Sequence, residues 1–99
     1  MTDTLDPVDW PEFRQTAHKM LEAALDRMQS ASRGDVWTPV PDQIKEGLQT
    51  PLPENGVGAG QMQQKIEAIL PYGVGNTHPR FFGWVHGAGT PTGLIADIT

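Results

Sequence analysis

Cysteine is absent from the 99 residues of this chain, which excludes disulfides and thiolate chemistry. Basic residues are also few, because seven Lys and Arg stand against twelve Asp and Glu, for a net charge of −5. Nucleic acids and anionic membranes are bound through basic patches, so neither is an expected partner. The sequence has no apolar run near the ~18 residues of a membrane span, and its N-terminus has no signal-peptide pattern. This composition is compatible with a reducing cytosol, and we expect a cytoplasmic protein.

The apolar residues other than Gly make up 37% of the chain, whereas the roughly 45–50% of typical soluble domains includes Gly. The 11 Gly and 9 Pro are concentrated after Asp35, which is too many helix breakers for a compact helical bundle. The β-branched alternation of a sandwich or barrel is missing too. We therefore expect a mostly α chain with extended loops that needs other protein to pack against.

The clearest local signal predicts a helix over residues 10–32. Asp9 is suited to cap its N-terminus, Pro11 fits its first turn, and Gly34 is a plausible stop. Apolar residues recur at intervals of three and four and so form one stripe along this helix. The stripe comprises Trp10, Phe13, Ala17, Met20, Leu21, Ala24, Met28 and Ala31. Few apolar residues remain elsewhere to cover it, so we expect it to dock onto another domain or subunit.

The rest of the chain alternates short helices with loops. We expect further helices at residues 41–48, at residues 60–70 and from Pro91 onward. Pro71 is expected to end the second of these, and Thr90 to cap the last. Residues 1–8 are polar and expected to be flexible, and residues 72–89 are expected to form a loop or short strand.

Three histidines are the first candidates for chemistry. His78 and His86 lie eight residues apart with Asp97 downstream, which is a weak metal pattern without Cys or a helical His pair. Hydrogen-bonding roles in a loop are the favoured interpretation, and His18 is expected to be solvated. The nucleophile elbow and the phosphate-loop motif are both absent from the sequence. We therefore expect no catalytic residue and no metal site in this chain.

Three aromatic residues within four positions have two interpretations. Such a cluster commonly packs in a core or interface. In an extended segment, alternation would point Phe81 and Gly83 to one side and Phe82 and Trp84 to the other. One pair would then anchor the segment while the other lines a cavity. Arg80 either pairs with a carboxylate or phosphate or lies on the surface.

These residues also carry a family resemblance. Residues 78–84 read His-Pro-Arg-Phe-Phe-Gly-Trp, residues 89–91 read Gly-Thr-Pro and residues 94–97 read Leu-Ile-Ala-Asp. Together they closely resemble the pyridoxal-phosphate-dependent group II amino-acid decarboxylases, which include the aromatic-amino-acid, glutamate and histidine decarboxylases. The resemblance covers nearly the whole chain, is strongest in residues 69–97, and matches only the N-terminal part of such an enzyme.

The resemblance implies a lyase of amino-acid metabolism that releases CO₂ from an L-amino acid with pyridoxal 5'-phosphate. The full-length protein would be a homodimer of the fold-type I, aminotransferase-like α/β class. After the flexible residues 1–8, residues 9–70 would be the helical segment that packs against the partner subunit. Residues 71–99 would form a pocket-wall loop and the start of the next helix, so we expect a fragment of a longer enzyme.

By resemblance, five residues form part of the substrate-pocket wall. They are Phe82, Trp84, Val85, His86 and Gly87, with Trp84 as the aromatic wall and Val85 as its neighbour. The animal aromatic-amino-acid enzymes have Pro at the position of His86 and Thr at that of Gly87. Gly87 cannot offer the hydroxyl that Thr brings toward the substrate, so the identity of the amino acid stays open.

The family's cofactor lysine is not found in this sequence. Lys19, Lys45 and Lys65 all lie in polar helical contexts rather than in the cofactor setting. We therefore expect no catalytic or cofactor-binding residue here, no cofactor on this chain alone, and an inactive fragment. The alternative is a standalone helical interaction module that docks on a decarboxylase subunit.

Overall fold

Helices are the regular elements of the part of the chain that the computed structural model describes, namely residues 4–73, 77–82 and 89–99. They are α1 (Trp10–Ser30), α2 (Asp42–Leu48), α3 (Ala59–Ile69), the short 3₁₀ turn η1 (Leu70–Tyr72) and α4 (Pro91–Ile98). No strand occurs within the described ranges. The prediction of a mostly α chain with extended loops is confirmed for them.

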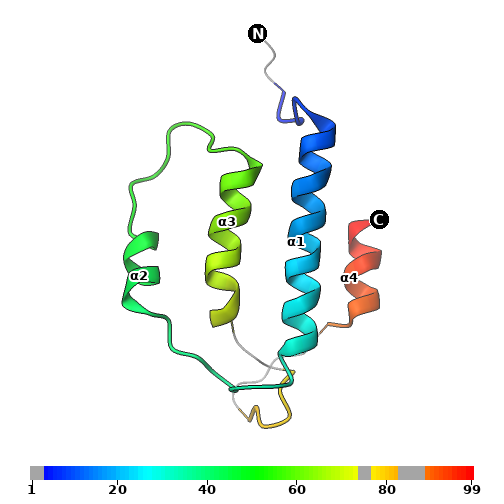
Figure 1. Ribbon diagram of the computed structural model, residues 1–99, viewed down its shortest axis with the longest axis vertical. Helices are drawn as coiled ribbons and strands as arrows, with labels where there is room; N and C mark the ends of the chain where they lie inside the picture. The colour runs from blue at the N-terminus through cyan, green and yellow to red at the C-terminus, as the bar shows by residue number, and fades with distance from the viewer. Residues whose placement is uncertain (1–3, 74–76, 83–88) are drawn as a thin grey trace.

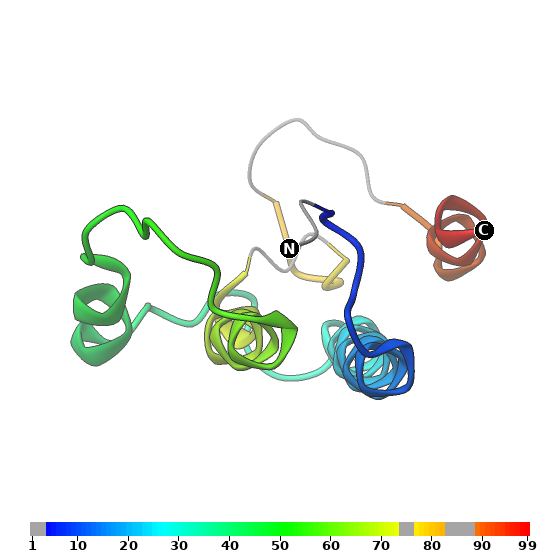
Figure 2. The same ribbon diagram turned by 90° about the horizontal axis from the view of Figure 1, so that it is seen from above.

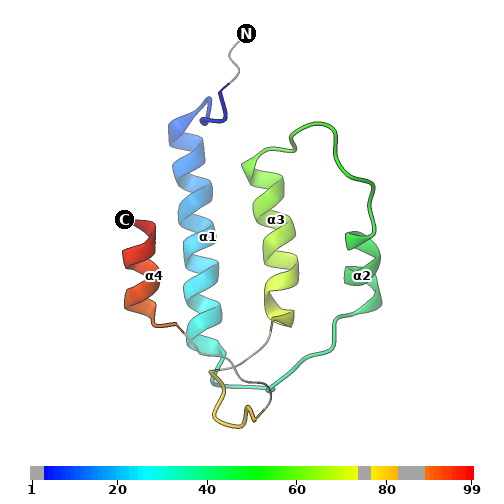
Figure 3. The same ribbon diagram turned by 180° about the vertical axis from the view of Figure 1, so that it is seen from behind.

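The helices stand roughly side by side. α1 and α3 are neighbours and run in the same direction, whereas α2 runs the opposite way on the far side of α3 (Figure 1). Seen from above, α2, α3 and α1 form a row, and α4 is set off from that row (Figure 2). The view from behind shows α4 on the side of α1 that faces away from α3 (Figure 3). The closest packing in this arrangement is between α1, α3 and η1.

The start of α1 follows the local rules that predicted it. The side chain of Asp9 accepts a hydrogen bond from the backbone N–H of Glu12 at 3.0 Å. Pro11 occupies the first turn, where its missing N–H leaves no hydrogen bond unmade. The carboxylate of Glu12 also lies near the positive end of the helix dipole. These features place the helix start at Trp10, as predicted.

The end of α1 comes slightly earlier than predicted, at Ser30 rather than residue 32. The hydroxyl of Ser30 donates to the carbonyl of Arg27, and the N–H of Arg33 donates to the carbonyl of Ser30 in a tight turn. Gly34 then adopts a φ of 82°, a left-handed conformation that glycine tolerates without a Cβ penalty. Together these residues turn the chain out of the helix and toward α2.

The shorter helices lie where the sequence placed them. α2 begins after Pro41 and α3 ends at Ile69, where the chain continues into η1 with Pro71 inside it. The hydroxyl of Thr90 accepts from the N–H of Gly93 at 3.0 Å and so caps α4 as predicted. In the region expected to be loop or short strand, the described residues form turns.

The described residues do not form a closed core. Among them no side chain is fully buried, and the radius of gyration is 16.3 Å against about 13 Å for a compact chain of this length. The middle and end of the predicted stripe on α1 are half-buried against α3 and η1, but Trp10 and Phe13 are 54% and 38% exposed. The helices therefore cover each other only in part, and large apolar side chains remain in contact with water.

Within the described ranges, no helix combines the length and the apolar character needed to cross a bilayer. The longest, α1, carries charged residues along its length, such as Arg14, Lys19 and Asp26.

Candidate functional site

The predicted pocket wall is only partly within the described residues. Phe82 belongs to them and is 92% exposed. Trp84, Val85, His86 and Gly87 lie outside the described residues. The part of the site that can be built from geometry is therefore the segment of residues 77–82 that leads to them.

A β-turn organises this segment. The backbone N–H of Phe81 donates to the carbonyl of His78 at 3.0 Å, which closes a four-residue turn. Pro79 occupies its second position, where the fixed φ of proline is favoured. The imidazole Nδ1 of His78 lies 3.0 Å from the backbone nitrogen of Arg80 and accepts its hydrogen bond. Asn and Asp side chains stabilise turns in the same way, by accepting from a backbone N–H two residues on.

The turn also exposes one aromatic side chain and partly covers another. Phe81 is half-buried, whereas Phe82 is exposed. This difference agrees with the predicted alternation, in which the two rings point to opposite sides of the segment.

His78 contacts the end of α1 through its other ring nitrogen. Nε2 lies 2.8 Å from the carbonyl oxygen of Gly34, which is 44 positions away in the sequence. The favoured interpretation of His78 as a hydrogen-bonding loop residue is confirmed. Its ring is half-buried, whereas His18 on α1 is exposed as expected for a solvated residue.

A second contact joins the same two regions. The guanidinium Nη2 of Arg27, in the last turn of α1, donates to the carbonyl oxygen of Gly73 at 3.1 Å. Gly73 directly follows η1, and its own N–H donates to the carbonyl of Leu70. The end of α1 thus contacts the chain on both sides of residues 74–76.

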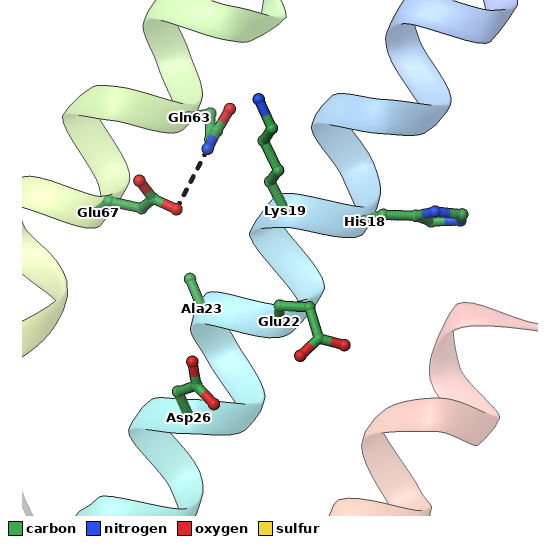
Figure 4. A pocket seen from close by; sticks show the side chains of 7 residues that line it. All are labelled: His18, Lys19, Glu22, Ala23, Asp26, Gln63 and Glu67. Atoms are coloured by element: carbon green, nitrogen blue, oxygen red, sulfur yellow. Dashed lines mark hydrogen bonds between the residues drawn. The ribbon is translucent and has the colours of Figure 1, made fainter.

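An open depression of about 530 Å³ lies along α1 and α3. Its lining residues are His18, Lys19, Glu22, Ala23, Asp26, Gln63 and Glu67. Figure 4 shows Lys19 and Asp26 on the side of α1 toward α3, and His18 pointing away from α3. The amide of Gln63 donates to Glu67 at 3.2 Å along α3, and none of the lining side chains is buried. This depression has the character of a solvated surface between helices rather than of an enclosed site.

The described residues do not fit a pyridoxal-phosphate site. Such a site needs a lysine that faces an enclosed pocket, yet Lys19, Lys45 and Lys65 are all exposed on helices. Within the described ranges no cluster of three or more His, Asp or Glu residues is arranged to hold a metal ion. Arg80, which the sequence left open as an anion partner, has an exposed side chain.

The sequence analysis did not identify either of these two contacts. Gly34 was predicted only as a helix stop, and no role was predicted for Arg27. The sequence contains the residues that make these contacts, but it has no local pattern that would pair residues 44 and 46 positions apart.

Comparisons of the chain with protein-family models, with curated proteins and with solved structures found no match.

Proposed function

We propose that this chain is the N-terminal segment of a pyridoxal-phosphate-dependent group II amino-acid decarboxylase, a cytoplasmic carboxy-lyase that releases CO₂ from an L-amino acid. The observation that carries this proposal is the run of residues 78–84, followed by the motifs at residues 89–91 and 94–97. In this proposal the full-length protein has a fold-type I α/β architecture. The present chain supplies part of the substrate-pocket wall, and the cofactor lysine belongs to the remainder of the enzyme.

The incomplete core supports the proposal. An N-terminal segment that packs its helices against a partner subunit needs apolar side chains that its own fold leaves exposed. Trp10 and Phe13 in the first turn of α1 meet that requirement, since they are 54% and 38% exposed. Homodimer formation would bury them, and burial of such side chains stabilises association.

The exposure of Phe82 supports a role in the pocket wall. Its ring is 92% exposed, although a free aromatic side chain gains stability by leaving water. The adjoining turn is ordered by the hydrogen bonds of His78. An exposed ring next to such a turn is suited to line a cavity that the rest of an enzyme completes.

The test begins with the gene. We expect the reading frame to continue past codon 99 and to encode a lysine in the family's cofactor setting. The full-length product should then show a cofactor absorbance band and release CO₂ from one member of a panel of L-amino acids. The matched control is the same protein with that downstream lysine replaced by alanine, which should lose both signals. A continuous frame whose product neither binds the cofactor nor releases CO₂ would contradict the proposal.

A standalone interaction module is the second candidate, favoured by one observation. The rings of Trp10 and Phe13 lie edge to face, with centroids 5.8 Å apart and planes at 82°. This exposed pair is a preformed apolar contact point of the kind that anchors protein interfaces. The module would dock on a decarboxylase subunit, and light scattering of the mixture tests this. We expect a complex that is lost in Trp10→Gln but kept in Arg14→Gln. A chain that stays monomeric and does not bind the decarboxylase subunit would contradict this candidate function.

A further inference from the structure

The hydrogen-bond partners of His78 determine the position of its ring proton. Nδ1 faces the backbone N–H of Arg80 at 3.0 Å, and this group can only donate. Nε2 faces the carbonyl oxygen of Gly34 at 2.8 Å, and this atom can only accept. A neutral imidazole has one donor and one acceptor nitrogen. Both hydrogen bonds form together only when Nδ1 carries no proton and Nε2 carries one.

We infer that His78 is a positioning residue, held as the Nε2–H tautomer. Its Nε2–H bonds the turn of residues 78–81 to the carbonyl oxygen of Gly34, which follows α1 in the chain. The inference deepens the proposed function, because this turn leads directly into Phe82 and the expected pocket wall. One ring makes two contacts at once. Nδ1 accepts within the turn, and Nε2–H donates to the carbonyl oxygen of Gly34, in the turn that follows α1 and 44 positions away.

Arg27 makes the attachment a two-point contact. Its guanidinium holds the carbonyl of Gly73 at 3.1 Å, before residues 74–76, and His78 holds Gly34 after them. One hydrogen bond would leave the turn free to pivot about the contact, whereas two separated bonds, one from the last turn of α1 and one to the turn after it, restrict rotation. Both bonds are exposed to water, so the restriction comes from having two of them.

The geometry also explains why another residue would not substitute for His78. Asn carries an acceptor at the distance of Nδ1 but is too short to reach Gly34. Gln carries an N–H at about the reach of Nε2 but has no acceptor close to the backbone of Arg80. Histidine combines the two functions in one rigid ring, in the way that histidines bound to a carbonyl have their tautomer set by that partner.

The direct test is the tautomer of His78 in the intact 99-residue chain. Nitrogen-15 NMR of the imidazole rings in mildly alkaline buffer, where histidine side chains are neutral, shows which ring nitrogen carries the proton. We expect His78 to be in a single state with the proton on Nε2. His18, which is exposed on α1, is the internal control and should average between tautomers as a free imidazole does. A His78 that averages like His18, or that carries its proton on Nδ1, overturns the inference.

Two substitutions of His78 separate the role of Nδ1 from the role of Nε2. In His78→Asn the amide of Arg80 should keep its protection from hydrogen exchange, because the acceptor remains. In His78→Gln that amide should exchange roughly fivefold faster, the change expected for loss of one ordinary hydrogen bond. His18→Asn is the matched control and should leave the Arg80 amide unchanged. Equal protection of that amide in all four proteins would overturn the role of Nδ1.

The contact to Gly34 needs its own measurement. The carbonyl carbon-13 resonance of Gly34 should move in His78→Asn, which cannot reach it, and should move less in His78→Gln. An unchanged resonance in His78→Asn overturns the attachment to α1. These results are independent of the reading frame beyond residue 99. A correct tautomer in a protein without decarboxylase activity would therefore refute the proposed function while leaving this inference in place.

In a full-length decarboxylase, the positioning role of His78 should be visible in the steady-state kinetics. Displacement of the pocket wall weakens substrate binding without altering the reacting groups, so His78→Asn should raise KM more than it lowers kcat. A variant that lowers kcat alone would overturn a positioning role.

Discussion

The guanidinium of Arg27 donates a hydrogen bond of 3.1 Å to the carbonyl oxygen of Gly73, 46 positions further along the chain. Arg27 lies in the last turn of α1, and Gly73 follows η1. This bond joins the last turn of α1 to the chain directly after η1. Loss of the Arg27 side chain should therefore weaken the packing of both α1 and the segment after η1.

Replacement of Arg27 by Gln should destabilise the packing of η1 against α1 by about 1 kcal/mol, the typical net value of one hydrogen bond. The measurement is urea unfolding followed by circular dichroism. Arg27→Lys keeps a positive charge near the negative end of the helix dipole but not the reach of the guanidinium, so it should recover only part of the loss. Arg14→Gln is the control on the same helix, and an equal effect there would show that charge alone accounts for the change.

Loss of the Asp9 cap should shorten α1 from its N-terminus. Asp9→Ala leaves the N–H of Glu12, now bonded at 3.0 Å, without its acceptor, which costs about 1 kcal/mol. Asp9→Asn keeps an acceptor oxygen and should retain most of the stability. Amide exchange in the first turn of α1 measures the effect. Similar exchange rates in both variants would mean that Pro11 alone fixes the start of the helix.

Two glycines should respond to alanine with opposite signs. Gly34 has a φ of 82° and an open surrounding, so Gly34→Ala is disfavoured by backbone conformation alone, by about 1–2 kcal/mol. Gly47 lies inside α2, again with open space around it, and Gly47→Ala should favour that helix by up to about 1 kcal/mol. Circular dichroism during thermal unfolding compares the two. A stabilised Gly34→Ala would contradict the left-handed turn after α1.

Small-angle X-ray scattering of the dilute chain should show an expanded particle. The Cα radius of gyration is 16.3 Å, whereas a compact domain of this size has about 13 Å. Iodide should also quench the fluorescence of Trp10 and Trp37 efficiently, because both side chains are more than half exposed. A radius near the compact value together with protected tryptophans would contradict the open packing.

Pyridoxal phosphate added to the 99-residue chain should produce no saturable absorbance band, because its lysines are exposed on helices. Exposed amines react weakly and without saturation, so the titration should be linear. Lys19→Arg, Lys45→Arg and Lys65→Arg should each reduce this background by a similar, small amount. A band that saturates at one cofactor per chain and disappears in only one of these variants would show a built site and would contradict the expectation.

Part of the candidate site was predictable from the sequence and part was not. Alternation in an extended segment predicts that Phe81 and Phe82 point to opposite sides, and their different exposures are compatible with that prediction. The hydrogen-bonding role of His78 was predicted, but its partner was not. Trp84, Val85, His86 and Gly87 remain predictions from resemblance, since they lie outside the described residues.

Local sequence signals were enough to predict where α1 and α4 begin, because a helix start depends on neighbours within one turn. Asp9 and Thr90 cap the N–H groups three residues on, and proline fixes the first turn that follows each of them. Only the tertiary structure shows that His78 contacts Gly34 and that Arg27 contacts Gly73. Contacts across more than forty residues depend on how whole helices are placed, and that placement is set by the sum of many weak packing terms rather than by any local pattern.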